Sequence, residues 1–297
     1  MPRTLIIVGL TVLTLIAFAA NSVLGRLALV DGDIGAWSYT LIRIVSGAAV
    51  LLCLTGVKDS VSEGTWAGAG SLLLYAVFFS FAYLLLATGT GALILFAAVQ
   101  LTMLGYGFLK GERLSGLQWT GFILAIGGLI YLLSPGIEAP SLTGAVLMAG
   151  SGIGWGIYSI LGKGAGRPTA RTSGNFLRAG AVLILFSGPA LWVLPEALPT
   201  AKGWALAVAS GAVTSALGYA LWYHVLKDIT VTRAGIAQLS VPAIAALGGV
   251  VFVAEPLTFR FAAASALILS GVAAATLTRD TPQAELALNI NPENSAD

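Results

Sequence analysis

Apolar stretches long enough to cross a lipid bilayer follow one another along almost the whole chain, and this feature restricts the possible folds most. A helix of about 20 mostly apolar residues covers the hydrocarbon core of a bilayer. By this rule the sequence predicts about ten spans, at roughly 5–29, 34–56, 65–87, 91–109, 117–134, 142–162, 172–194, 202–226, 232–254 and 260–278. The expected fold class is an all-α integral membrane protein with short connections, such as residues 88–90, and no soluble domain.

The composition supports lipid as the solvent and excludes several other classes. Charged residues make up only 9% of the chain and hydrophobic residues 57%, whereas about a quarter of a soluble domain is charged. Lys and Arg stand in short breaks rather than blocks, which argues against nucleic acid as a partner. The single Cys53 provides neither a disulfide framework nor a metal cluster. No metal, cofactor or obligatory protein partner is expected.

Both chain ends are expected in the cytoplasm of a bacterial cell whose inner membrane holds the protein. The first apolar segment is too long for the core of a signal peptide, so we predict that it is retained. With ten spans the termini share a side, and cytoplasmic loops are enriched in Lys and Arg. That side would collect Arg3, Lys58, Lys110, Arg113, Lys163, Arg167, Arg171, Lys227, Arg233 and Arg279, against Arg26, Lys202 and Arg260 on the other. Residues 280–297 are polar and predict a disordered tail.

Two apolar spans joined by a polar break occur twice in the chain. At one constant offset, Glu112 in the first break corresponds to Glu255 in the second, and Gly128 corresponds to Gly271. Upstream, the further matches are Arg26 with Lys163, Arg43 with Arg178, and Tyr83 with Tyr219. The sequence therefore predicts two five-span halves, residues 1–137 and 138–279. An odd number of spans inverts the second half, which is typical of secondary transporters.

These repeated residues also resemble a known family. The breaks at 111–114 and 254–257, the paired glycines and arginines, and Trp155 within residues 152–158 are similar to the EamA-type ten-helix permeases of the drug/metabolite transporter superfamily. Residues 218–222 and 240–242 resemble those of YddG-like amino acid exporters. One departure is Val99, where many relatives carry a proline that Pro242 keeps in the second half. The fourth helix is thus expected to be straighter than the ninth. The resemblance implies alternating access and export of amino acids, aromatic and apolar ones included, and of related metabolites.

Aromatic side chains at helical spacing predict the wall of a solute cavity. An amphipathic organic solute suits aromatic rings that carry a few hydroxyl or N–H groups. The candidates are Tyr83, Phe96, Trp155, Tyr158, Tyr219, Trp222 and Tyr223. The alternative is packing or lipid contact, which we favour for Tyr75 because it lies nearer a span end. The first, third, fourth, sixth, eighth and ninth spans are expected to line the cavity.

Polar side chains in the middle of spans are costly in lipid and therefore face protein or water. Asn21, Gln100, Gln238 and Ser240 are candidates for solute contact, and interhelical hydrogen bonds are the alternative for them. Pro242 is expected to kink the ninth helix or to free a carbonyl for a ligand. Together with Glu112 and Glu255 in the breaks, it is a candidate for a hinge or gate between the paired helices.

Few charged groups lie inside the predicted spans. Arg43 and Arg178 do, and both structural hydrogen bonding and binding of a carboxylate are open to them. We expect their helices to lie outside the central aromatic set. His224 is the one titratable candidate for a proton relay, and an interfacial position is the simpler interpretation. No Asp or Glu occurs in the middle of a span, so we predict facilitated export rather than tight proton coupling.

Three alternatives remain. An exporter of lipophilic drugs would have the same fold and a similar aromatic cavity. A nucleotide-sugar carrier would require more central Lys and Arg than this chain has. A membrane-embedded enzyme would require an acid–base pair, an activated nucleophile or metal ligands, and the spans offer none of these.

Overall fold

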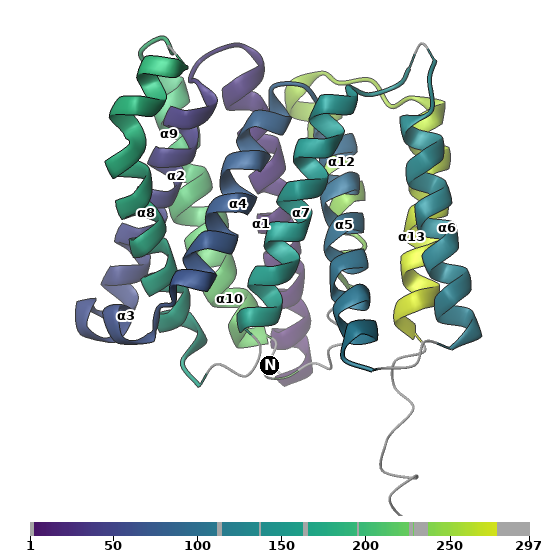
Figure 1. The fold of residues 1–297 in the computed structure, drawn as a ribbon, viewed down its shortest axis with the longest axis horizontal. Helices are drawn as coiled ribbons and strands as arrows, with labels where there is room; N and C mark the ends of the chain where they lie inside the picture. Colours follow the sequence, from purple (N-terminus) through teal and green to yellow (C-terminus); the bar gives the residue numbers. More distant parts are fainter. Residues whose placement is uncertain are drawn as a thin grey trace, which may run out of the picture.

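The fold is built from helices that run between two faces of one bundle (Figure 1). The computed structural model describes residues 3–111, 115–136, 138–162, 166–194, 196–225, 228 and 237–277, and within these residues there is no strand. The helices are α1 (Arg3–Val30), α2 (Ala36–Thr55), α3 (Val57–Glu63), α4 (Trp66–Tyr83), α5 (Thr88–Leu109), α6 (Gly116–Leu133), α7 (Leu142–Gly162), α8 (Pro168–Val193), α9 (Ala201–Val208), η1 (Ala209–Leu217), α10 (Gly218–Val225), α12 (Val241–Val253) and α13 (Phe259–Leu277).

The helices confirm the predicted ten-helix membrane fold. Eight of them, with α9, η1 and α10 forming one crossing, are long and apolar enough to span a bilayer, and two shorter apolar helices cover Val241–Val253 and Phe259–Ala274. Two details of the prediction are wrong. Residues 88–90 do not connect helices but form the first turn of α5, because the chain already turns at residues 84–87. In addition, residues 57–63 form the short helix α3 after the second span.

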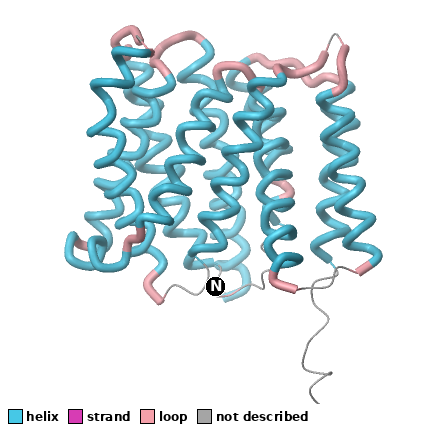
Figure 2. The backbone as a smooth tube through the Cα atoms, viewed as in Figure 1, coloured by secondary structure: helices cyan, strands magenta, loops and turns pink. Residues whose placement is uncertain are grey.

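Both described ends of the bundle lie on one face. In Figure 1, α1 begins and α13 ends at the bottom, where α3 and the start of α8 also lie; we call this the terminal face. The connections 31–35, 84–87 and 254–258 lie at the top, on the opposite face, as the pink loops of Figure 2 show. The first and last described helices thus begin and end on the same face. Which face is cytoplasmic stays a prediction.

Helix packing repeats across the two predicted halves in the way that the predicted duplication requires. The helix α4 packs on α7 as α1 packs on η1 and α10, and α5 packs on α7 as α1 packs on α12. The equivalent helices α2 and α8, α5 and α12, and α6 and α13 pack on each other. The repeat-related glycines lie in the last of these contacts, where a Cβ on Gly271 would stand 2.6 Å from the carbonyl oxygen of Gly121 and one on Gly128 would stand 2.7 Å from Ile268. The halves therefore interleave rather than form separate units.

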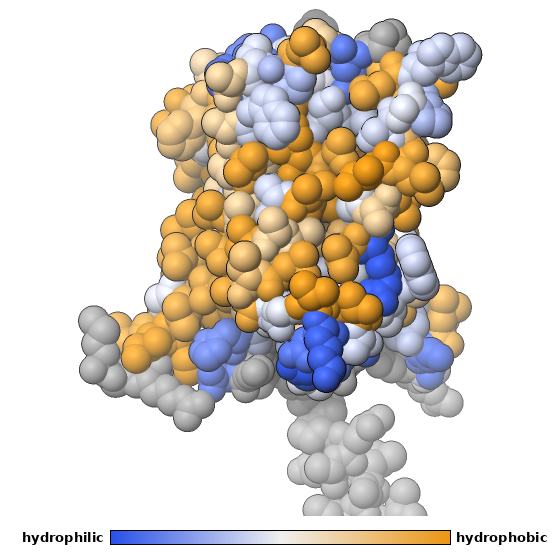
Figure 3. Space-filling view, turned by 90° about the vertical axis from the view of Figure 1, so that its left-hand side faces the viewer, coloured by the Kyte–Doolittle hydropathy of each residue, from blue (hydrophilic) through white to orange (hydrophobic). Residues whose placement is uncertain are grey.

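The outer surface matches a bilayer environment. Figure 3 shows a broad hydrophobic band between polar rims on the side of the bundle formed by α2, α3 and α8. On α8, the large apolar side chains of Ile184, Leu185 and Phe186 are all exposed. A helix surface of this kind is stable where lipid tails rather than water cover it.

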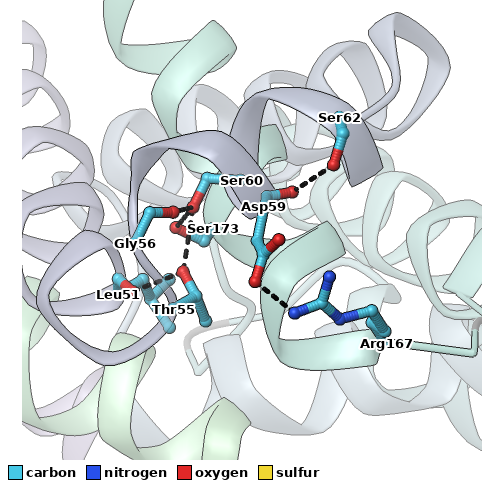
Figure 4. A network of polar contacts seen from close by, with 8 residues as sticks. All are labelled: Leu51, Thr55, Gly56, Asp59, Ser60, Ser62, Arg167 and Ser173. Atoms are coloured by element: carbon cyan, nitrogen blue, oxygen red, sulfur yellow. Dashed lines mark hydrogen bonds and ion pairs between the residues drawn. The ribbon is translucent and has the colours of Figure 1, made fainter.

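Polar contacts tie the two halves together at each face. On the terminal face, the Ser60 hydroxyl of α3 donates to Ser173 Oγ at 2.8 Å, and Arg167 pairs with Asp59 beside it (Figure 4). The Arg167 hydrogen bond lowers the pKa of the Asp59 carboxyl below its usual range. On the opposite face, the Glu196 carboxylate accepts from the backbone N–H groups of Trp37 and Ser38 at 2.8 and 3.0 Å. It thereby satisfies the unpaired donors at the start of α2.

Candidate functional site

A small cavity lies at the centre of the bundle, where helices of the two halves meet. Its walls come from α1, α4 and α5 of the first half and from α7, η1 and α10 of the second. They are formed by Phe18, Asn21, Ser22, Tyr75, Phe79, Leu95, Phe96, Trp155, Thr214 and Tyr219. The cavity volume is about 20 Å³, and a single water requires about 10–15 Å³ by this measure. In this conformation the cavity is therefore nearly collapsed.

Aromatic rings form most of the cavity wall, with Trp155 at their centre. The Trp155 ring lies 4.7 Å from that of Tyr219 and 5.0 Å from that of Tyr75, centroid to centroid, and it stacks on Tyr158 at 5.4 Å. Phe18 meets Trp155, Tyr219 and Trp222 edge to face. The edge-to-face contacts of Phe18 are a geometry that the ring quadrupoles favour, whereas Trp155 is tilted against Tyr75 and Tyr219.

Two glycines bring α7 close enough to place Trp155 in this wall. A Cβ on Gly154 would stand 2.7 Å from the Tyr75 nitrogen in α4, and one on Gly152 would stand 2.5 Å from the Leu95 carbonyl oxygen in α5. No side chain fits at these distances. The small residues thus let α7 pack directly against the backbones of both neighbours, as in other membrane helix contacts.

A buried hydrogen-bond network lies on the other side of the cavity. The Asn21 amide donates to the Tyr75 hydroxyl at 3.1 Å, and its oxygen accepts from Ser210 at 2.7 Å and from Thr214 at 3.2 Å. The last two residues belong to the π-helix η1, together with Ser215. A π-helical turn is wider than an α-helical one and is often found at functional sites. Here it directs hydroxyls toward α1 and α2.

Arg43 joins this network from α2. Its side chain is only 1% exposed. Its Nη2 donates to the Tyr75 hydroxyl at 2.6 Å and its Nε to Ser215 Oγ at 3.2 Å. The guanidinium carbon also lies 5.0 Å from the ring centre of Tyr75 and 4.7 Å from that of Phe79. The helix α2 contributes no residue to the described cavity wall, but the long side chain of Arg43 extends inward from α2 to the rings of Tyr75 and Phe79.

The repeat-related Arg178 has a different environment. Its guanidinium donates to the carbonyl oxygens of Gly174 at 3.1 Å and of Val61 at 3.0 Å, near the terminal face. Its guanidinium carbon lies 5.8 Å from the ring centre of Trp66. Arg178 thus reaches outward to the end of the bundle, as expected for a snorkelling side chain.

An ion pair closes the bundle above the cavity on the opposite face. Arg26 Nε and Glu255 Oε1 are 3.0 Å apart, and both side chains are mostly buried. Glu255 Oε2 accepts from the Thr88 backbone at 2.7 Å, while Arg26 Nη1 donates to the Tyr83 carbonyl at 2.7 Å. The pair therefore connects the ends of α1 and α4 to the start of α5 and the segment after α12.

On the terminal face, the bundle is more open. A cavity of about 450 Å³ opens there between the end of α2, α3, the start of α8 and α10, and Asp59, Arg167, Tyr223 and His224 are in its wall. A smaller pocket, with Tyr158, Arg171 and Tyr223 in its wall, lies between these helices and α7. Tyr158 stacks on Trp155 of the central cavity. Open space thus approaches the aromatic wall from this face.

The structure brings some of the predicted site residues together and separates others. Asn21, Phe96, Trp155 and Tyr219 line the central cavity, and Tyr83, Tyr158 and Trp222 contact rings of its wall. The remaining predicted residues do not line it, and of these Gln100 is buried, Tyr223 and Gln238 are half-buried, and Ser240 and His224 are exposed. Glu112 lies outside the described residues. No described residue of the ninth span lines this cavity, and residues 232–236 of that span lie outside the described residues.

Pro242 has a different local role from the predicted kink. The helix α12 begins at Val241, after a turn at Leu239 and Ser240, and Pro242 lies in its first turn. Proline is favoured there because its missing N–H would have no partner in any case. The ninth span is therefore interrupted by a turn, whereas α5 with Val99 runs without a break.

Several cavity residues were not among the predicted ones. Tyr75 was assigned to an interface, but it is buried and contacts Asn21, Arg43 and Trp155. Phe18 and Thr214 of the cavity wall and Ser210, which donates to Asn21, were also missed. The four-residue spacing from Ser210 to Thr214 and from Tyr75 to Phe79 places each pair on one helix face. That spacing is the signal from which they could have been found.

Comparison with known proteins agrees with this architecture. The profile of the EamA-like transporter family matches residues 142–277. An uncharacterized protein of Pseudomonas aeruginosa is 48% identical over 91% of this chain and 93% of its own. The aromatic amino acid exporter YddG of Ancylobacter novellus is 28% identical over 89% of this chain and 96% of its own. The threonine/homoserine exporter RhtA of Salmonella typhimurium is 31% identical over 54% of this chain and 55% of its own. A solved crystal structure superposes with a TM-score of 0.63 at 27% identity, over 89% of this chain and 97% of that one.

Proposed function

Because the chain belongs to the EamA-like transporter family of the drug/metabolite transporter superfamily, we propose that it exports amino acids, aromatic and apolar ones included, and related small metabolites. The observation that carries this proposal is the cavity between the two halves, with its ring of aromatic side chains on one side and the Asn21 network on the other. An amino acid has matching parts, an apolar side chain and a polar head group. The names of two relatives that export amino acids support the same substrate class.

Transport proceeds by alternating access around this cavity. Release on the opposite face requires the Arg26–Glu255 pair to separate, while the terminal face already carries the large open cavity. The hairpins formed by α5 with α6 and by α12 with α13 are the parts that hinge, and Glu112, Glu255 and Pro242 are the candidate hinge or gate residues. The terminal face is cytoplasmic in this proposal.

The energy source is the solute gradient itself. No described Asp or Glu lines the central cavity, and His224 is exposed at the terminal face rather than in the cavity wall. A proton-coupled carrier usually places an ionisable group at its transport site. The transporter is therefore a facilitator.

Uptake of labelled L-phenylalanine and L-threonine into proteoliposomes tests the proposal. Trp155→Ala and Tyr219→Ala should lower saturable uptake by about tenfold, because each removes an aromatic contact worth roughly 0.5–1.5 kcal/mol beyond its buried area. The control is Trp204→Ala on α9, because this tryptophan is 51% exposed and is not part of the cavity wall. A pH gradient should leave the wild-type rate unchanged.

Other outcomes of this assay have definite meanings. Uptake driven by the pH gradient would contradict the facilitator mechanism. Absence of uptake for all twenty amino acids, with transport of a lipophilic drug, would favour the drug-exporter alternative, which the same aromatic wall permits.

A further inference from the structure

The central site contains a buried positive charge that has no negatively charged partner among the described residues. The Arg43 guanidinium is 1% exposed, and the ion pairs between described residues involve Arg26, Arg167 and Lys202 but not Arg43. Its Nη1 has no hydrogen-bond partner among the described residues. A guanidinium in a medium of low dielectric is costly unless it is paired and fully hydrogen-bonded. The positive charge of Arg43 is thus not balanced by any described residue.

Arg43 acts on the cavity through Tyr75. It lies behind the Tyr75 and Phe79 rings, and both of these residues are in the cavity wall. The Tyr75 oxygen accepts hydrogen bonds from Arg43 Nη2 at 2.6 Å and from Asn21 Nδ2 at 3.1 Å. A phenol oxygen has two lone pairs, and Arg43 and Asn21 bond to both of them. The hydrogen of the Tyr75 hydroxyl must therefore point to a third group. Two donors on the oxygen, one of them charged, polarise this O–H group and strengthen the bond that it donates.

We propose that Arg43 and Tyr75 form an anion-selecting element, which recognises the carboxylate of the transported solute. This inference rests on the proposed transport function and specifies the chemistry of the same cavity. A carboxylate that accepts from the Tyr75 hydroxyl brings the missing negative charge to Arg43. Arg43 is here a positioning residue, because it acts on the solute through Tyr75.

The same element excludes cations. An ammonium group without a carboxylate would stand near Arg43 with the same sign of charge, in a site where little water screens the repulsion. No carboxylate of a described residue lines the cavity to offset this. Free amines, including cationic drugs, are therefore poor ligands, whereas zwitterions and simple carboxylates are good ones.

Three ligands that share a phenyl ring but differ in their charged groups can distinguish recognition of charge from apolar contact. L-phenylalanine, 3-phenylpropionate and phenethylamine would be titrated into the purified full-length protein in detergent by calorimetry. Wild type should bind the first two at least about tenfold more tightly than phenethylamine, as expected for a charge-assisted hydrogen bond. Arg43→Gln and Tyr75→Phe should remove most of this difference.

Matched variants separate this role from a loss of folding. Arg178→Gln removes the repeat-related guanidinium and should leave the order of the three ligands unchanged. Arg43→Lys keeps the positive charge but lacks the planar guanidinium. It should therefore bind the three ligands in the same order of affinity, but more weakly. Each variant would first be checked for a monodisperse gel-filtration peak.

Several results would overturn the inference: equal binding of phenethylamine and 3-phenylpropionate by wild type, an unchanged preference in Arg43→Gln, or no binding of any of the three. The proposed function has a separate readout. If 3-phenylpropionate binds in an Arg43-dependent manner but no amino acid is taken up by proteoliposomes, the anion-selecting element stands and the amino acid exporter does not. If amino acids are taken up but the amine binds equally well, the opposite holds.

Discussion

Arg43 and Arg178 occupy equivalent places in the two halves, yet one lies inside the bundle and the other reaches its edge. Arg43 bonds to the side chains of Tyr75 and Ser215, which come from opposite halves. Arg178 bonds to the carbonyl oxygens of Gly174 and Val61 near the terminal face. The two arginines that the predicted duplication pairs therefore have different environments, which their neighbouring side chains determine. The two predicted halves share their helix packing but not their polar chemistry.

The largest effect is expected when the inner arginine loses its charge. Arg43→Gln should reduce amino acid uptake by about 10- to 100-fold, the equivalent of one charge-assisted hydrogen bond at 1.5–3 kcal/mol. The measurement is the initial rate of uptake into proteoliposomes at low substrate concentration, normalised to the amount of reconstituted protein. If the rate is retained, Arg43 is a structural residue like Arg178, and the contrast between the two has no functional meaning.

An intermediate effect is expected at the ion pair of Arg26 with Glu255. Glu255→Gln removes the charge that holds Arg26, Thr88 and the end of α12 together. The opposite face should then open more often, and uptake should fall by about threefold because the closed state loses roughly 1 kcal/mol of stability.

Cysteine accessibility measures this opening directly. Ser22 lines the cavity and is buried, so Ser22→Cys in a Cys53→Ala background gives one reporter thiol. A membrane-impermeant maleimide added from the opposite face should label it faster when Glu255→Gln is present. Lys202→Met is the matched control, because its ion pairs with Asp31 and Asp33 lie on the same face but outside this closure. Equal labelling of the two variants would exclude a gating role for Glu255.

The smallest effect is expected at the outer arginine. Arg178→Gln should change uptake by less than about twofold and lower the free energy of unfolding by at most about 1 kcal/mol, as is usual for partly exposed charged groups. Thermal unfolding in detergent and uptake in proteoliposomes measure the two quantities. A loss of transport as large as that of Arg43→Gln would show that both arginines serve one site, which would remove the proposed division between inner and outer roles.

The sequence predicts the fold well because hydrophobic length and internal repetition are properties of the chain itself. Ten spans and two related halves follow from counting apolar residues and matching landmarks such as Glu112 with Glu255. The rotation of each helix does not follow in this way. It depends on contacts such as those of Gly152 and Gly154 with the backbones of α4 and α5.

The candidate site shows this limit most clearly. Tyr75 lies one helical turn from Phe79, and its position along the span allows either an interface or a buried role; packing of α7 decides for the latter. For Arg43 the sequence also leaves two directions open, since a long side chain in a membrane helix can reach inward or outward. The hydroxyls of Ser210 and Thr214 donate to Asn21 because the π-helical segment η1 places them there. No pattern of residues in the sequence predicts that π-helical segment.

The interleaving of the halves also has a consequence for the synthesis of the protein. Asn21 and Arg43 obtain hydrogen-bond partners, Ser210 and Ser215, that lie 189 and 172 residues further along the chain. At about 5–20 residues per second, the ribosome reaches these partners only about 10–40 seconds later. During this interval Tyr75 is already present, but the Asn21 oxygen and Arg43 Nε lie in or beside the membrane without the hydroxyls that later bond to them. The transport site is therefore completed only after most of the bundle has been made.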